Sequence, residues 1–356
     1  MAPLRVDLFG SPREIGLEHG RRLSAQIKAQ IKVYEAMFKT TSKLDWSAVR
    51  EIAKAYAATV ESLTPALYTE MLAIAEGADL DVLDIVALNA RSEIALGLFS
   101  DGCTSLGWKC SEGQVYLCQN WDWTARVKEN ILMMSIDQPG KPKIWMVTEA
   151  GIVGKIGFNS SSVGTCLNAI RARPTDPTKL PFHLALRIAL ESTSSQAAIS
   201  SLESLGVASA QHLLIADLTG PLSLELSPVG RAILPPNEHG FIAHTNHFIE
   251  NRSVDEPPWL ANSPVRLNRI NELTNKLVSD KQAVSSTVLR ECIFSDMYNA
   301  PGSICCQEDP ARPIETRSST LFNIIMKFSA KGQPTAEVVW GKPGSGEEGQ
   351  VLHMPW

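Results

Sequence analysis

No segment of the 356-residue sequence approaches the eighteen or so consecutive apolar residues of a membrane-spanning helix. The N-terminal stretch MAPLRVDLFGSPREIG lacks the apolar core of a signal peptide, and the C-terminal HMPW is not an S-K-L-type peroxisomal address. We therefore expect a cytoplasmic protein that does not bind membranes.

An excess of either charge is missing as well. The chain has 33 Lys and Arg against 38 Asp and Glu, and these residues are scattered without long runs. Nucleic acids and anionic membranes attract proteins through concentrated positive charge, which this sequence does not provide. We expect small-molecule substrates and no nucleic-acid partner.

The cysteines do not form the pattern of a disulfide framework. Their number is odd and their spacing irregular in a long chain, so we expect free thiols. The adjacent pair Cys305 and Cys306 then has its simplest interpretation as two buried thiols. The seven cysteines are Cys103, Cys110, Cys118, Cys166, Cys292, Cys305 and Cys306.

Metal-ligand patterns are also sparse. His244 and His247 stand three residues apart in the sequence His-Thr-Asn-His, but no third ligand lies nearby. We expect these histidines to orient the loop around Asn246. The sequence predicts neither a metal nor an organic cofactor.

The first hundred residues predict helices. Ser11, Pro12 and Glu14 form a capping-box start, with proline at the first helical position. Pro65 begins another helix, which we expect Gly77 to end. A further helix is expected from Asp81 through residue 95.

From Cys103 onward the pattern changes to short runs of apolar and β-branched residues, which favour strands. Helices are expected near 184–190, 197–205 and 264–294. Strands in two groups with helices between them indicate stacked layers and an α+β fold. The expected strands are 115–119, 131–136, 144–148, 164–168, 213–218, 222–226, 321–328 and 336–340.

The pair Gly102-Cys103 lies where the helical region meets the strand-rich one. A glycine before a cysteine lets the backbone strain and lets the thiol reach the preceding carbonyl, which permits an N-to-S acyl shift. Hydrolysis would free the α-amino group of Cys103, whose ordinary pKa of about 7.7–8.0 suits it as a base for its own thiol. Taken alone, such a pair is more often an ordinary turn or a buried thiol.

Several separate motifs, in the right order along the chain, make the sequence resemble the fungal acyl-coenzyme A:isopenicillin N acyltransferases. That family belongs to the cysteine N-terminal-nucleophile hydrolases and is similar to penicillin V acylase and bile salt hydrolase. The motifs are Arg13-Glu14-Ile15-Gly16, Glu18-His19-Gly20, Asp101-Gly102-Cys103-Thr104-Ser105, Gln119-Asn120-Trp121-Asp122, Thr148-Glu149-Ala150-Gly151, Gly157-Phe158-Asn159, His244-Thr245-Asn246-His247 and Thr320-Leu321-Phe322-Asn323-Ile324-Ile325.

This resemblance implies a four-layer αββα sandwich preceded by a helical segment. It also implies autocleavage between Gly102 and Cys103, which would release residues 1–102 as a helical α subunit and 103–356 as a β subunit containing the αββα core. The two subunits are expected to remain together as a heterodimer.

By the same resemblance, Cys103 is the nucleophile and Asp122 contacts its α-amine, where a carboxylate would tune the pKa of the amine. Asn246 occupies the oxyanion-hole position, where an amide donor would stabilise the tetrahedral intermediate by roughly 3–4 kcal/mol. Arg317 matches an arginine expected to support the thiolate and the carboxylate network.

Three further positions match with supporting roles. Asn168 matches a polar position near the nucleophile, and Ser227 matches a serine of the fungal enzymes whose role could be structural. Thr316 stands where the penicillin-forming enzymes have serine, and its extra methyl could alter processing. Together with the absent peroxisomal tripeptide, Thr316 suggests a cytosolic paralogue of the main enzyme.

The expected activity is replacement of the aminoadipyl side chain of isopenicillin N by an aromatic acyl group from acyl-CoA, through 6-aminopenicillanate and a Cys103 acyl-enzyme. Two alternatives remain. One is an N-acyl amidohydrolase with the same catalytic residues and a different pocket, and the other is an unprocessed paralogue that binds a ligand or partner without catalysis.

Overall fold

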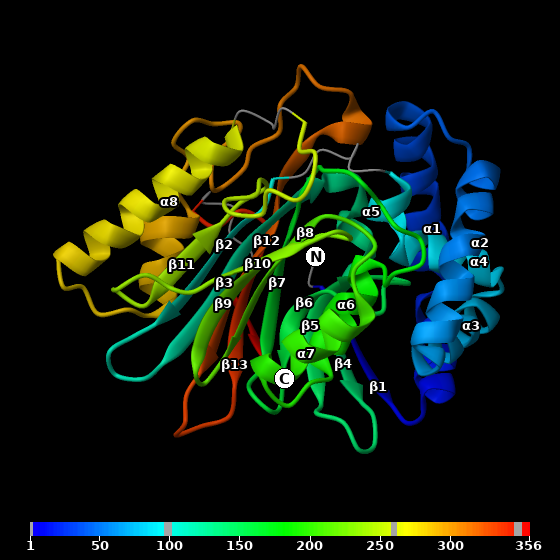
Figure 1. The fold of residues 1–356 in the computed structure, drawn as a ribbon, viewed down its shortest axis with the longest axis horizontal. Coiled ribbons are helices and arrows are strands. Elements are labelled where there is room, and N and C mark those ends of the chain that lie inside the picture. Colours follow the sequence, from blue (N-terminus) through cyan, green and yellow to red (C-terminus); the bar gives the residue numbers. More distant parts are fainter. Residues whose placement is uncertain (1–2, 96–101, 258–261, 345–350) are drawn as a thin grey trace.

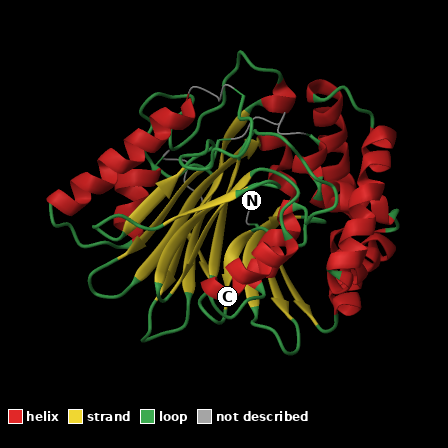
Figure 2. Ribbon diagram, viewed as in Figure 1, coloured by secondary structure: helices red, strands yellow, loops and turns green. Residues whose placement is uncertain are grey.

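The computed structural model describes residues 3–95, 102–257, 262–344 and 351–356. Within these ranges the protein is a mixed helix and sheet structure, with two sheets stacked between helices (Figure 1, Figure 2). No helix in these ranges combines the length and the apolar character that a bilayer span requires.

The N-terminal helices pack beside the sheets, as Figure 1 shows. The capping box predicted at the start of α1 is confirmed, because Ser11 Oγ accepts from the backbone of Glu14 while the Glu14 carboxylate accepts from the backbone of Ser11. The predicted helix from Asp81 is interrupted at Ala90. The helices are α1 (Pro12–Thr41), α2 (Trp46–Leu63), α3 (Pro65–Ala78), α4 (Val82–Asn89) and α5 (Arg91–Ile94).

Gly77 does not end α3 as expected, since the helix continues to Ala78 and Asp79 takes the left-handed conformation after it. Gly77 instead lets α3 approach α1, because a Cβ there would stand 2.4 Å from the carbonyl oxygen of Leu17. Gly20 serves the same contact from α1, where a Cβ would lie 2.2 Å from the oxygen of Ile74. Both glycines are therefore required by close backbone approach.

The first segment is not entirely helical, which corrects the sequence-based expectation. Strand β1 (Leu4–Phe9) joins a sheet and runs parallel to β4 (Ile131–Asp137). Its alternating burial, with Val6 and Leu8 inside, is typical of an edge strand with one covered face. Residues 4–9 therefore share a sheet with residues beyond Cys103.

Two sheets form the centre of the described structure. The eight-stranded sheet has the order β1-β4-β5-β6-β7-β8-β9-β10, and the six-stranded sheet has the order β11-β2-β3-β12-β13-β14. The remaining strands are β2 (Thr104–Lys109), β3 (Val115–Thr124), β5 (Ile144–Glu149), β6 (Ile156–Asn159), β7 (Gly164–Ala169), β8 (Gln211–Asp217), β9 (Gly220–Leu226), β10 (Arg231–Leu234), β11 (Phe241–His244), β12 (Ser318–Phe328), β13 (Thr335–Trp340) and β14 (Val351–Met354).

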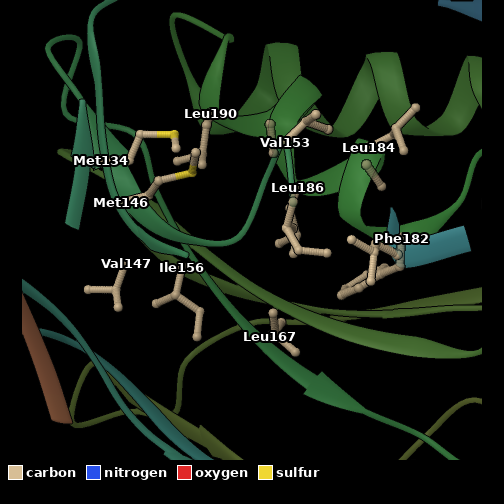
Figure 3. Packing of buried hydrophobic residues seen from close by; sticks show 14 of the residues in the cluster. Met134, Met146, Val147, Val153, Ile156, Leu167, Phe182, Leu184, Leu186 and Leu190 are labelled. Carbon is tan, nitrogen blue, oxygen red and sulfur yellow. The ribbon is translucent and has the colours of Figure 1, made fainter. Parts of the chain in front are cut away.

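The sheets pack face to face, with β2 and β3 of one against β7, β8 and β9 of the other. Strands β3, β5 and β8 are buried along their whole length, as expected for strands covered on both faces. Figure 3 shows the apolar packing between the eight-stranded sheet and α6, where Leu186 and Leu190 lie among Met134, Met146 and Ile156.

Helices cover the outer face of each sheet and complete the four layers of an αββα sandwich (Figure 1). Helices α6 (Phe182–Leu190) and α7 (Ser195–Leu205) lie on the eight-stranded sheet. Helix α8 (Asn262–Ser279), the short α9 (Ser286–Leu289) and the π-helical turn Arg290–Phe294 lie on the six-stranded sheet. Of two 3-10 turns, Ala125–Asn130 connects β3 to β4, and Ile314–Thr316 lies directly before β12.

Candidate active site

Cys103 stands immediately before β2, and its side chain is fully buried. Its backbone nitrogen donates to the side-chain oxygen of Asn246 at 2.8 Å. Residues 96–101 lie outside the described structure, so the Asp101 of the sequence motif cannot be placed. Cys103 and Asn246 are 143 positions apart in the sequence, and in the structure they are in direct contact.

Asn246 presents its oxygen, not its nitrogen, to Cys103. The side-chain nitrogen of Asn246 donates to the carbonyl oxygen of Ala169 at 3.0 Å, and its backbone nitrogen donates to Ser263 Oγ at 2.9 Å. These contacts fix the amide orientation, since two donors face Oδ1. In this structure Asn246 is therefore an acceptor for the nitrogen of Cys103, whereas the oxyanion role expected from sequence needs a donor.

A buried guanidinium from α8 joins these groups. Arg266 Nη1 donates to the carbonyl oxygen of Cys103 at 2.6 Å and to Thr104 Oγ1 at 2.9 Å. Its Nη2 donates to Asn246 Oδ1 at 2.8 Å. Arg266 thus holds both Cys103 and the residue that contacts the nitrogen of Cys103, a role that the sequence did not reveal.

Arg317, the arginine expected at the nucleophile, takes a different place. Its Nε donates to the carbonyl oxygen of Arg312 at 2.8 Å and its Nη2 to that of Pro310 at 2.8 Å. Thr316 beside it donates to the carbonyl oxygen of Pro313 at 3.1 Å, in a 3-10 turn. In these contacts Arg317 and Thr316 brace the segment that leads into β12, and the guanidinium at Cys103 comes from Arg266.

Asp122 lies on β3, fully buried, and accepts from Thr320 Oγ1 of β12 at 2.6 Å. Thr320 Oγ1 in turn accepts from the backbone nitrogen of Cys306 at 2.9 Å. Gly102 lies against this carboxylate, because a Cβ built on Gly102 would be 3.4 Å from Asp122 Oδ2 and 3.6 Å from Arg266 Nη2. An anion and a cation therefore flank the residue on the amino side of the Gly102-Cys103 bond.

Cys306 borders this group as a buried thiol. Burial, together with the negative charge of Asp122, raises the pKa of Cys306 to about 12. The thiol therefore stays protonated at neutral pH, in agreement with its interpretation as an ordinary buried cysteine.

Asn168 on β7 connects the start of β2 to the second sheet. Its side-chain oxygen accepts from Ser105 Oγ at 2.7 Å and from His212 Nδ1 at 2.8 Å. His212 Nε2 faces Ser223 Oγ at 2.8 Å, and burial lowers the pKa of His212 well below 6.5. The neutral imidazole then donates from Nδ1 and accepts at Nε2.

Glu225 organises the loop that carries Asn246. Its carboxylate accepts hydrogen bonds from His244 Nε2 at 2.9 Å and from the backbone nitrogens of Glu250 at 2.9 Å and Asn251 at 2.6 Å. The ring of His244 stacks on His212 with centroids 3.5 Å apart. These contacts fit the expectation that the histidine motif orients the Asn246 loop, and no group of three or more metal-ligating side chains occurs in the described ranges.

Ser227 has local contacts. Its hydroxyl donates to the carbonyl oxygen of Gly230 at 2.6 Å and accepts from the nitrogen of the same residue at 3.0 Å. These bonds close the turn between β9 and β10. Ser227 thus has a turn-forming role in this structure, which agrees with the structural alternative considered for it.

Comparisons with known proteins address the family directly. The family model described as acyl-coenzyme A:6-aminopenicillanic acid acyl-transferase matches residues 108–344. The chain belongs to this family. It is 35% identical over 354 residues to the acyl-coenzyme A:6-aminopenicillanic-acid-acyltransferase 40 kDa form of Emericella nidulans, covering 98% of this chain and 96% of that protein.

Two solved structures of more distant proteins also align with this chain. A mutant of the conjugated bile acid hydrolase from Clostridium perfringens aligns with a TM-score of 0.49 at 12% identity, covering 71% of this chain and 92% of that one. Penicillin V acylase from Agrobacterium tumefaciens aligns with a TM-score of 0.42 at 12% identity, covering 67% and 83%.

Proposed function

We propose that this member of the acyltransferase family is a self-processing enzyme, which cleaves between Gly102 and Cys103 and then carries acyl groups on the Cys103 thiol. The observation that supports it most directly is the set of groups around this one peptide bond. Asn246 holds the nitrogen of Cys103, and Arg266 holds its carbonyl. Asp122 and Arg266 flank the preceding glycine.

Cleavage would begin with attack of the Cys103 sulfur on the carbonyl carbon of Gly102. The carbon–nitrogen bond breaks, the thiol proton passes to the nitrogen, and a thioester forms. Water then hydrolyses this thioester, leaving a carboxylate on Gly102, a free thiol and a free α-amine on Cys103. The nitrogen that Asn246 contacts in the uncut chain becomes that amine.

In the proposed acyl transfer, the freed amine takes the proton of the thiol, and the sulfur attacks an acyl carbonyl. Attack on the side-chain amide of isopenicillin N would transfer the aminoadipyl group to the sulfur and leave 6-aminopenicillanate, and water would then hydrolyse this thioester to release 2-aminoadipate and the free thiol. Attack on an acyl-CoA would release coenzyme A, and the amine of 6-aminopenicillanate would then take the new acyl group. Coenzyme A enters only as part of a substrate.

The two segments are expected to remain associated after cleavage. Gln30 and Tyr34 of α1 both donate to Glu149 on β5, and Arg91 of α5 forms an ion pair with the same carboxylate at 2.8 Å. Strand β1 adds parallel pairing with β4. Buried contacts of this kind favour a stable heterodimer of residues 1–102 and 103–356.

We also place the enzyme in the cytoplasm. All seven cysteines are described and all are free thiols, which suits a reducing compartment.

The experiment that tests the proposed function is incubation of the purified protein with phenylacetyl-CoA and 6-aminopenicillanate, with Cys103→Ala as the control. We expect stoichiometric release of coenzyme A and formation of the acylated penicillin, measured by chromatography and mass spectrometry, in the wild type alone. Release of phenylacetate without the acylated product would favour the amidohydrolase alternative. Absence of both products from a folded protein would contradict the acyltransferase proposal.

A further inference from the structure

The fully buried Lys155 lies just before β6 and is part of an ion cluster that the reaction described above does not use. Its ammonium forms an ion pair with Glu149, and it stands 3.6 Å from the centroid of the Trp121 ring. Arg91 is bonded to the same carboxylate at 2.8 Å. We refer to Arg91, Glu149 and Lys155 as the buried ion cluster.

The buried ion cluster contains two cations and one anion. Glu149 and Lys155 are fully buried and Arg91 is 4% exposed. The remaining bonds to Glu149 come from Gln30 and Tyr34, which are neutral donors.

Strand register places the side chain of Cys103 on this side of the six-stranded sheet. Thr104 is paired with Asn120 in the antiparallel β2–β3 ladder. One further step places Cys103 opposite Trp121, and the next places Gly102 opposite Asp122. The contact that a Cβ on Gly102 would make with Asp122 agrees with this continuation.

Directly opposed residues of an antiparallel pair point to the same face of a sheet. Cys103 and Trp121 also belong to one buried apolar cluster. The thiol of Cys103 therefore lies on the same face of the six-stranded sheet as the Trp121 ring. The Lys155 ammonium lies over that ring. Asp122, one residue along β3, points to the opposite face.

The electrostatic coupling agrees with this placement. Burial lowers the pKa of Lys155 to about 8, with Glu149 opposing the shift and Arg91 adding to it, and the charge of a Cys103 thiolate raises it. The lysine cation and the thiolate therefore stabilise each other.

Within the described part of the chain, three other titratable groups beside the cluster are held neutral or are bonded elsewhere. Burial raises the pKa of Tyr34 well above 10 and lowers the pKa of His183 well below 6.5. Glu93 on α5 accepts from Ser209 Oγ at 2.7 Å and from the backbone of Phe182 at 3.0 Å.

We propose that Lys155 supplies the positive charge that stabilises the thiolate of Cys103 in the self-processed enzyme, so that the sulfur is a nucleophile at neutral pH. The inference rests on the proposed function and assigns to the same site an electrostatic supporting residue. Glu149 fixes the position of the ammonium. Three residues of the first segment, Gln30, Tyr34 and Arg91, bind Glu149 and in this way help to position Lys155.

The test measures the rate at which iodoacetamide modifies Cys103 of the self-processed protein between pH 5 and pH 10, followed by peptide mass spectrometry. Lys155→Met is the main variant, because Arg91 and Glu149 then remain as a matched ion pair. Lys155→Arg retains the cation. Lys141→Met is the matched control, since Lys141 also pairs with a glutamate, at 2.5 Å, but on the outer side of the protein.

We expect Lys155→Met to raise the apparent pKa of Cys103 alkylation by at least one unit, which corresponds to about a tenfold slower reaction at neutral pH. Lys155→Arg and the control should keep the wild-type value. If Lys155→Met yields no folded protein, Lys155→Gln provides the same readout. A Lys155→Met chain that stays uncut while Lys155→Arg is cut also supports the inference, because cleavage begins with the same sulfur.

A processed Lys155→Met or Lys155→Gln protein with the wild-type alkylation pKa would overturn the inference. So would wild-type Cys103 that stays unmodified up to pH 10. Failure of the proposed function would be seen in the wild type, either as a chain that stays uncut or as a cut chain that transfers no acyl group. Cleavage and acyl transfer are therefore measured on the same samples as alkylation.

Discussion

The side-chain oxygen of Asn246 accepts the backbone nitrogen of Cys103 and the guanidinium of Arg266, each at 2.8 Å. Under the proposed self-processing, this oxygen would orient the Gly102-Cys103 bond before cleavage. After cleavage, the same side chain would have an amine as its neighbour. The nitrogen of Asn246 would be the group available for an oxyanion, once it leaves the carbonyl oxygen of Ala169.

Asn246→Asp separates these two roles, because aspartate retains an acceptor for Cys103 and Arg266 but has no amide donor. We expect self-cleavage to persist and kcat for acyl transfer to fall about 10²–10³-fold, the usual effect of removing one oxyanion donor. Asn246→Leu should impair both steps. Cleavage by electrophoresis and transfer by product formation are the two measurements, and an Asn246→Asp enzyme with wild-type kcat would show that the amide donor is unnecessary.

Arg266 and Arg317 form a matched pair for mutation to methionine. Arg266→Met removes charge-assisted hydrogen bonds to Cys103 and Asn246, worth about 1.5–3 kcal/mol each. We therefore expect cleavage at least about 30-fold slower. Arg317→Met removes bonds to two carbonyls of its own loop and should change the rate less than about threefold.

Time courses of cleavage at 25 °C measure both variants. The reverse order, with Arg317→Met the slower protein, would support the role that sequence resemblance gave to Arg317. It would also mean that the segment before β12 rearranges toward Cys103.

Helices α1 and α3 approach each other closely at Gly20, so we expect alanine at this helical position to destabilise the protein. Gly20→Ala should destabilise the protein by about 1–3 kcal/mol, although alanine favours helices by up to about 1 kcal/mol over glycine. The reason is that its Cβ would lie 2.2 Å from the oxygen of Ile74. Urea unfolding measures the change, and Gly332→Ala, where a Cβ meets nothing within 4 Å, is the near-neutral control.

His19 predicts a pH dependence of stability. The buried ring accepts from the backbone nitrogen of Gly151 at 3.0 Å, and burial, together with the charge of Arg187, lowers the pKa of His19 to about 3. Below the unfolded pKa of about 6.5 the unfolded chain binds a proton that the folded chain does not. Stability is therefore lost as pH falls from about 6.5 toward 3.

Comparison of His19→Gln with the wild type isolates this contribution. We expect the wild-type free energy of unfolding to fall between pH 7.5 and pH 5 by about 2 kcal/mol more than that of the variant. Glutamine retains an acceptor for Gly151, so the variant should still fold. Equal losses in the two proteins would contradict a neutral buried His19.

Much of the fold was readable from local patterns. The Ser11 capping box, the long buried strands and helices α6 and α7 have strong local signals, and the structure contains each of them. Strand β1 was missed because only its pairing with β4 makes it a strand. Gly77 was misread because its role depends on a neighbouring helix rather than on its own.

The residues of the candidate site that belong to sequence motifs could be predicted from the sequence. Cys103, Asp122 and Asn246 are gathered at one place, with Gly102 against the carboxylate. Arg266 had no signal in the sequence, because an arginine on an amphipathic helix is usually a solvated residue and its burial depends on the packing of α8.

The most direct test of the central proposal is the intact mass of the purified protein, measured beside Cys103→Ala together with denaturing electrophoresis. We predict that the wild type, whose 356 residues amount to 38.8 kDa, separates into chains of about 11 and 28 kDa, in proportion to residues 1–102 and 103–356. The larger chain should begin Cys-Thr-Ser, and Cys103→Ala should remain whole. A wild-type chain that stays uncut after prolonged incubation would contradict the self-processing mechanism.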